Sequence, residues 1–207
     1  MLTIYGHSAS SNVRKVLWTC HELGVSHSHR DATGAELMAH SRDFLVINPN
    51  GMVPSIDDGG FLLWESNTII RYLAGKAARY DLLPQGVRER ALVEQWMDWQ
   101  STDFLNAWRN AFDGLVKKKP EASDPAVIES SRQAWIVKME ILDAQLGKTG
   151  GHITGPAFTL ADIPIGIAVN RWFTTPIERP DFPNVQAYYD RLTEREGYRL
   201  YGRNGLP

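Results

Sequence analysis

The sequence has 207 residues (23.3 kDa), enough for one large domain or two small ones with a core that needs neither disulfides nor metal. Hydrophobic residues (43%) and charged residues (22%) are close to the average for globular proteins, which excludes disordered and collagen-like chains. The net charge of −2 provides no basic field, so we expect neither a nucleic-acid partner nor a membrane partner.

The first third of the chain alternates between strand and helix patterns. Short apolar runs bounded by turn residues predict strands at residues 2–5, 25–29, 53–56 and 61–63. Apolar residues at helical spacing predict helices over residues 13–23 and 36–45, and a third that begins with Ser66 as its N-cap. The predicted order is therefore β-α-β-α-β-β-α.

Beyond a turn at residues 81–84 the chain is helical throughout. We predict one domain over residues 1–78, an all-helical domain over 86–207, and a linker at about 79–85. One long apolar stripe extends from Val93 to Phe112, and a further stripe begins at Trp135. Thr159 and Asp162 are spaced as a capping box, so we expect Asp162 to have a folding role rather than a catalytic one.

The loop between the first strand and the first helix, residues 6–12 (GHSASSN), is the first candidate site. At this place in an open α/β sheet, backbone N–H groups and the helix dipole can meet a ligand. Ser8, Ser10, Ser11 and Asn12 are also good capping residues, so a plain helix N-cap is the alternative.

Two further segments are candidates for binding a peptide-like ligand. Val53-Pro54 is either a simple strand start or a cis peptide that leaves the Val53 backbone free to pair with an extended ligand. Glu65 and Ser66 can receive the amino and carboxylate groups of an amino acid, or they form an ordinary helix start.

Cysteine and histidine chemistry is limited. The single cysteine, Cys20, excludes a disulfide framework, suits a reducing compartment and lies on the apolar face of its helix, so we expect an inert thiol. His27 and His29 share one strand face but lack a third ligand, so we expect no metal. The N-terminus has no secretory signal pattern, and residues 163–169, the longest apolar stretch, are too short to span a membrane. We therefore expect a cytoplasmic protein.

In combination, these segments are much more specific than any one alone. The chain contains GHSASSNVRKV, NPNGMVP, WESNTIIRYLA and, in the helical half, GPAFTLADI. This set resembles the glutathione transferase family over almost the whole chain. The resemblance implies a thioredoxin-like α/β N-terminal domain followed by an all-α helical-bundle domain.

The resemblance also implies roles for individual residues. Ser10 takes the place of the catalytic serine of the serine-type classes, and Ser10 with Asn12 also matches the Thr/Asn pattern of some bacterial members; Ser11 is a neighbouring candidate. Val53 and Pro54 take the place that pairs with the cysteinyl backbone of glutathione. Glu65 and Ser66 take the place that holds its γ-glutamyl end.

The chain departs from the family pattern near the glycyl end of glutathione. Met52 stands where some relatives have Gln or Lys, and His40 is followed by Ser41 rather than Lys. Met52 and His40 are therefore expected to bind glutathione in a different manner. Phe104, Trp108 and Phe112 are candidates for the hydrophobic substrate pocket, with core packing or a dimer contact as the alternative.

The resemblance implies a glutathione S-transferase that conjugates the glutathione thiolate to small hydrophobic electrophiles in detoxification. Glutathione is then a co-substrate, no metal is needed, and the protein is a homodimer. Two alternatives stay open: a glutathione-dependent disulfide or peroxide reductase, and a non-catalytic scaffold or regulatory protein of the same fold. The joint presence of Ser10, Val53-Pro54 and Glu65-Ser66 argues against the scaffold.

Overall fold

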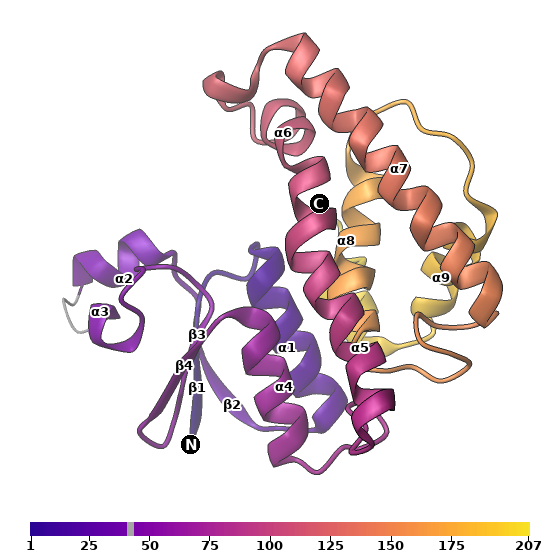
Figure 1. The fold of residues 1–207 in the computed structure, drawn as a ribbon. Helices are drawn as coiled ribbons and strands as arrows, with labels where there is room; N and C mark the ends of the chain where they lie inside the picture. Colours follow the sequence, from indigo (N-terminus) through magenta and orange to yellow (C-terminus); the bar gives the residue numbers. More distant parts are fainter. Residues whose placement is uncertain (41–43) are drawn as a thin grey trace. The chain divides into compact units, whose positions relative to one another are not determined.

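The computed structural model describes residues 1–40 and 44–207, and the side chain of His40 lies outside the described part. Contacts divide the chain into two compact units (Figure 1). The first comprises Met1–Gln85 with Glu196–Leu206, and the second comprises Gly86–Arg195 with Pro207. The domain boundaries predicted from the sequence stay a prediction, but the return of residues 196–206 to the first unit was not anticipated.

The first unit is built on a four-stranded mixed sheet of order β2-β1-β3-β4. Strand β1 (Leu2–Tyr5) pairs parallel with β2 (His27–Arg30) and antiparallel with β3 (Ser55–Asp58), which pairs antiparallel with β4 (Phe61–Trp64). Helices α1 (Ser11–Leu23) and α4 (Ser66–Lys76) lie side by side on one side of the sheet, and α2 (Gly34–His40) and α3 (Phe44–Ile47) lie on the other (Figure 1).

This arrangement confirms the predicted thioredoxin-like order, with local corrections. The predicted helix over residues 36–45 is two short helices, α2 and α3, and residues 41–43 between them lie outside the described part. Strand β2 begins two residues later than predicted, and β3 begins at Ser55 rather than Val53. The cause in the second case is Pro54, which has no N–H for the strand ladder.

Glycine is needed at two positions around α1, at its end and in the loop before it. Gly24 ends α1 in the left-handed region (φ 64°), which glycine adopts without strain. Gly6 has φ 146°, and a Cβ atom there would lie 2.5 Å from Val13 Cγ2 and 3.0 Å from Val53 Cβ. A side chain at residue 6 would therefore push the first loop away from the Val53-Pro54 segment.

The second unit contains helices α5 (Val87–Trp99), α6 (Leu105–Leu115), α7 (Pro125–Thr149), α8 (Asp162–Thr174) and α9 (Pro183–Leu192). The apolar stripe predicted from Val93 to Phe112 is interrupted by a π-helical turn at Gln100–Phe104, so it belongs to two helices rather than one. A 3-10 turn (Pro120–Ala122) precedes α7, and a π-helical turn (Tyr198–Gly202) lies in the returning segment of the first unit. In the part of the chain that the structure describes, no helix is both long and apolar enough to cross a bilayer.

Asp162 is fully buried at the start of α8. The N-cap of α8 is Ala161 rather than Thr159, so within the described residues the predicted capping box is present only in the hydrogen bond from Thr159 N–H to the Asp162 carboxylate. Its carboxylate accepts hydrogen bonds from the backbone N–H groups of Ile153 (3.0 Å) and Thr159 (2.7 Å) and from the hydroxyl of Tyr188 (2.9 Å). Burial raises the pKa of Asp162, and these hydrogen bonds to the charged form oppose that shift. The helix starts at Asp162, so Pro164 lies in the first turn, where its missing N–H is tolerated.

Candidate functional site

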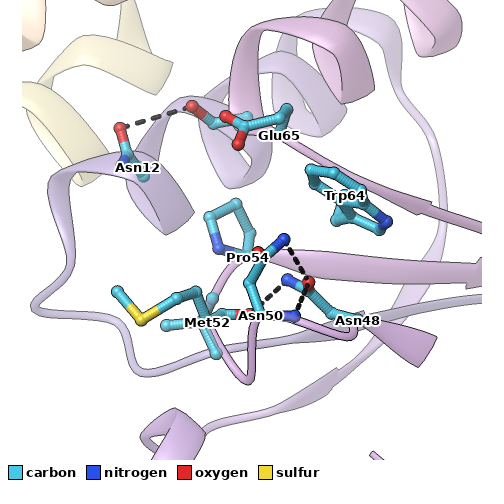
Figure 2. A pocket seen from close by; sticks show the side chains of 9 residues that line it. Asn12, Asn48, Asn50, Met52, Pro54, Trp64 and Glu65 are labelled. Carbon is cyan, nitrogen blue, oxygen red and sulfur yellow. Dashed lines mark hydrogen bonds between the residues drawn. The ribbon is translucent and has the colours of Figure 1, made fainter. Parts of the chain in front are cut away.

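A cavity of about 380 Å³ lies in the first unit (Figure 2). It is bounded by the first residues of α1, the loop before β3, and the junction of β4 with α4. The described residues that line it are Asn12, Asn48, Asn50, Met52, Val53, Pro54, Trp64, Glu65 and Ser66. Six predicted site residues, from three separate segments of the sequence, therefore meet at one cavity.

The loop before β3 is shaped by the buried side chain of Asn48 (Figure 2). Asn48 Nδ2 donates to Met52 O (2.8 Å) and to Ser55 Oγ (3.2 Å), while Asn48 Oδ1 accepts from the N–H (3.0 Å) and the side-chain amide (3.1 Å) of Asn50. The Val53-Pro54 peptide bond is cis. Because Asn48 fixes both arms of this loop, Val53 is held at the cavity wall, ahead of the paired residues of β3.

The junction of β4 and α4 contributes Glu65 and Ser66. Glu65 is exposed, has φ 71° and is the residue with a formal charge among the described lining residues. Ser66 is the first residue of α4 and Glu65 is its N-cap, so the predicted N-cap was one residue too late. The first N–H groups of α4 and the carboxylate of Glu65 thus form a pair of opposite polarity that suits an amino acid's two charged ends.

Asn12 connects α1 to this junction. Its Oδ1 accepts a hydrogen bond from Ser66 Oγ (3.3 Å), which is the dashed line that starts at Asn12 in Figure 2. Because Oδ1 is engaged, the Nδ2 amide group is left to donate to a ligand.

The serines of the first loop occupy different positions. Ser10 and Ser11 are half-buried and lie outside the set of described residues that line the cavity. Ser10 is the N-cap of α1 (φ −70°, ψ 123°), yet its hydroxyl makes no capping hydrogen bond within the described residues. Ser10 therefore takes the N-cap position of the predicted alternative without the side-chain hydrogen bond that usually accompanies it. Ser8 is exposed and its N–H donates to Asp31 Oδ1 (2.9 Å), a bond that lowers the pKa of Asp31.

Other predicted residues lie away from this cavity. His40 falls outside the residues whose side chains are described. Phe104, Trp108 and Phe112 are buried in the second unit, where Phe104 stacks on Trp99 at 4.8 Å between ring centroids. All three thus contribute to the helical core, and a role as substrate pocket stays a prediction.

Cys20 and the histidines of β2 are the remaining residues considered in the sequence analysis. Cys20 is buried, and burial raises the pKa of its thiol to about 12. His29 Nε2 lies 2.7 Å from Gly6 O and His27 Nδ1 lies 3.1 Å from Val25 O, so both rings contact the backbone. Among residues 1–40 and 44–207, no three His, Cys, Asp or Glu side chains gather as a metal site needs.

Sequence reasoning missed three lining residues: Asn48, Asn50 and Trp64. The two asparagines stand in the NPNGMVP segment and Trp64 directly precedes Glu65, so their places beside predicted site residues were the available signal. A buried asparagine that pairs with backbone groups of its own loop has no periodic signature, and its role emerges only from the hydrogen bonds.

The lining thus combines one carboxylate, amide and hydroxyl groups, a free backbone segment at Val53 and one exposed aromatic ring, with no metal ligand set among the described residues. Such a cavity suits a small peptide with a free amino-acid end. Comparison with known proteins agrees with this geometry. A family profile, Glutathione S-transferase, N-terminal domain, matches residues 4–81.

Relatives match over almost the full length. Glutathione S-transferase GstB of Escherichia coli is 37% identical over 201 residues, which cover 96% of each chain. Glutathione S-transferase F10 of Arabidopsis thaliana is 29% identical and covers 96% of this chain and 95% of its own. The theta class glutathione S-transferase of Xanthomonas axonopodis pv. citri with glutathione bound has a TM-score of 0.87 at 39% identity and covers 100% of this chain and 99% of its own. The chain belongs to the glutathione S-transferase family.

Proposed function

We propose that this protein is a glutathione S-transferase that transfers the glutathione thiolate to small hydrophobic electrophiles. The observation that carries the proposal is the cavity in which Asn12, Val53, Glu65 and Ser66 meet from three separate segments of the chain. In this assignment Val53 pairs with the cysteinyl backbone, and Glu65 with Ser66 holds the γ-glutamyl end. Met52, Asn50 and Trp64 are then left to face the glycyl end, to which His40 is also assigned.

The chemical task of the site is to keep the glutathione sulfur ionised. A thiol with a pKa of about 8.5 is mostly protonated at neutral pH, yet the thiolate is the nucleophile. We assign Ser10 Oγ and Asn12 Nδ2 as the donors that stabilise the thiolate, with Ser11 as a neighbouring candidate. Neither group takes a proton. The glutathione sulfur forms a bond to a carbon atom of the electrophile, and the leaving group departs from that carbon with its electron pair.

Several wider properties follow from the same proposal. The protein acts as a homodimer in the cytoplasm, in detoxification, and uses glutathione as a co-substrate without a metal. The electrophile is small and hydrophobic, and Phe104, Trp108 and Phe112 are its candidate pocket. Neither a nucleic acid nor a membrane is a partner.

An ultraviolet pH titration of glutathione on the purified protein tests the proposal. We expect thiolate absorbance with a midpoint well below that of free glutathione, and turnover of a chlorodinitrobenzene. A bound but unshifted thiol would contradict transferase chemistry. Failure of glutathione to bind at all would leave the scaffold alternative as the better description.

A second candidate is a glutathione-dependent disulfide or peroxide reductase. The observation in its favour is that Asn12 lines the cavity, whereas Ser10, the donor expected of a serine-type transferase, lies outside the set of described lining residues. Cys20 is buried with its pKa raised to about 12, so the protein supplies no accessible thiol and two glutathione molecules must supply both electrons. Reduction of hydroxyethyl disulfide or cumene hydroperoxide faster than conjugation of chlorodinitrobenzene would establish this function instead.

A further inference from the structure

The second unit has a cavity of its own, of about 280 Å³, where α8 ends and α9 begins. Its walls include the aromatic rings of Trp172, Phe173 and Phe182. The ring centroids of Trp172 and Phe182 lie 6.1 Å apart, and Phe173 stacks on Tyr189 at 4.4 Å. The volume is slightly below the range for drug-sized ligands, about 300–1,000 Å³, so the cavity suits a ligand no larger than one or two fused rings.

Arg179 provides the positive charge in the lining of this cavity. Its guanidinium donates to Trp172 O and Thr175 O and lies 6.0 Å from the centre of the Phe173 ring. No carboxylate of residues 1–40 or 44–207 forms an ion pair with it. Burial lowers the pKa of Arg179, which is the expected effect when a guanidinium is partly removed from water without a counterion.

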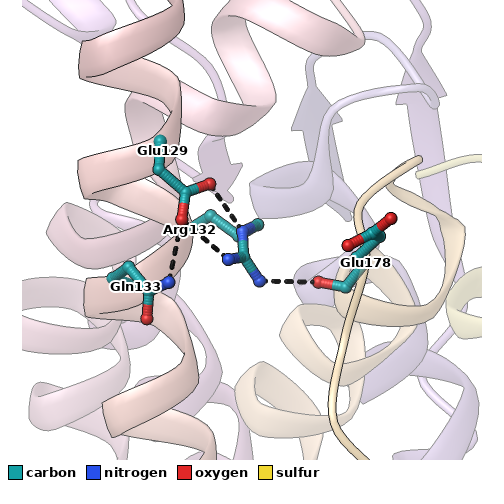
Figure 3. Close-up of polar contacts among 4 residues, drawn as sticks. All are labelled: Glu129, Arg132, Gln133 and Glu178. Atoms are coloured by element: carbon teal, nitrogen blue, oxygen red, sulfur yellow. Dashed lines mark hydrogen bonds and ion pairs between the residues drawn. The ribbon is translucent and has the colours of Figure 1, made fainter.

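The loop that carries Arg179 is held in place from α7 (Figure 3). Arg132 Nη1 donates to Glu178 O (3.0 Å), and the same guanidinium is paired with Glu129 at 2.7 Å. Gln133 also donates to Glu129, and these two partners lower the pKa of Glu129 to about 2. Arg132 is therefore fixed by charged and neutral contacts, and it fixes the backbone next to Arg179. A site held in this way loses little conformational entropy on binding.

We propose that this cavity binds a small planar aromatic carboxylate. The aromatic walls bury the ring of the ligand, and Arg179 pairs with its carboxylate through guanidinium N–H groups beyond those donated to Trp172 O and Thr175 O. The carboxylate of the ligand then serves as the counterion of the Arg179 guanidinium. Asp181 also lines the cavity, but it is exposed to water, which screens its repulsion of the ligand.

Calorimetric titration with naphthoate, and with uncharged naphthamide as the matched ligand, tests the proposal on the full-length protein. We expect naphthoate to bind with a dissociation constant of about 1 mM or below, and naphthamide at least tenfold more weakly. Arg179→Gln should weaken naphthoate binding by about tenfold or more. Gln186→Trp, which fills the cavity from an exposed position on α9, should abolish binding while Arg179 stays in place.

Two controls separate this site from other effects. Arg109→Gln removes the same charge from an exposed position on α6 and should leave naphthoate affinity unchanged. Saturation with S-hexylglutathione should also leave it unchanged. Thermal unfolding of each variant shows whether it is still folded. If Arg179→Gln fails to fold, Gln186→Trp still tests the cavity, because it keeps the contacts of Arg179. Absence of binding, equal affinity for naphthamide, full binding by both cavity variants, or displacement by S-hexylglutathione would each overturn the proposal.

Discussion

Asn12 offers the sharpest test of how the site activates glutathione. Its Oδ1 is engaged by Ser66 Oγ at 3.3 Å, so the amide N–H₂ is the part available to the thiolate. Asn12→Ala removes both functions. Asn12→Asp keeps an oxygen for Ser66 but replaces the donor with a negatively charged oxygen. Ser66→Ala removes the Ser66–Asn12 hydrogen bond from the other side and leaves the amide donor present.

The expected size of the effect follows from one hydrogen bond to a charged group, which contributes about 1.5–3 kcal/mol. One pKa unit corresponds to about 1.36 kcal/mol, so Asn12→Ala should raise the pKa of the bound thiol by about 1–2 units. At a pH below the thiol pKa of both proteins the thiolate fraction falls tenfold per unit of that shift, so kcat/KM measured there should fall by about 10–100-fold, and by less at pH 7 if the wild-type pKa is below 7. Asn12→Asp should raise the pKa further, because the carboxylate repels the thiolate.

The assay is the thiolate absorbance of bound glutathione against pH, together with the pH profile of kcat/KM. We expect the thiol pKa to increase in the order wild type, Asn12→Ala, Asn12→Asp, while Ser66→Ala mainly weakens glutathione binding. Ser10→Ala should raise the same pKa with little loss of stability if both donors act together. An unchanged thiol pKa in both Asn12 variants, with a raised pKa in Ser10→Ala, would refute the role of Asn12 as a donor.

Three other predictions concern binding, stability and reactivity. Glu65→Gln should weaken glutathione binding by about tenfold or more in calorimetry, since it removes the carboxylate that meets the ligand's ammonium group; equal affinity would refute the γ-glutamyl assignment. Asp162→Ala should lower the free energy of unfolding by about 3 kcal/mol or more in urea titration, because three buried donors lose their acceptor; a loss below about 1 kcal/mol would contradict this reasoning. Cys20, whose pKa is raised to about 12, should have a thiolate fraction of about one in ten thousand at pH 8 and resist iodoacetamide until urea unfolds the protein; rapid labelling of the native state would be contrary evidence.

The order of helices and strands could be predicted because each depends on local physics. The start of β3 was predicted at Val53, two residues early, although Pro54 has no N–H for the strand ladder. Gly24 ends α1 in the left-handed region, and the sequence carries a direct mark of this event. The same holds for Asp162, whose spacing from Thr159 predicts the hydrogen bond that the structure contains. These are interactions between residues within a few positions of one another.

The interruption of the stripe between Val93 and Phe112 could not be predicted in the same way. The periodicity of apolar residues continues across Gln100–Phe104, yet the backbone there forms a π-helical turn. Phe104 packs against Trp99 through this turn. A hydrophobic stripe records which side chains are buried, but not the winding of the backbone that buries them.

By itself, the sequence determined the order of helices and strands in the first unit, because propensity, turn chemistry and apolar spacing act over short distances, and it singled out six of the nine described residues that line its cavity. Only the tertiary structure decided that Asn12 meets Ser66 at a cavity, since a contact between residues 54 positions apart depends on how α1 and α4 pack. It also decided that residues 196–206 return to the first unit, where Tyr198 packs on Trp18 at 5.1 Å. Close packing between distant segments is a property of three-dimensional shape, and no local pattern in the chain encodes it.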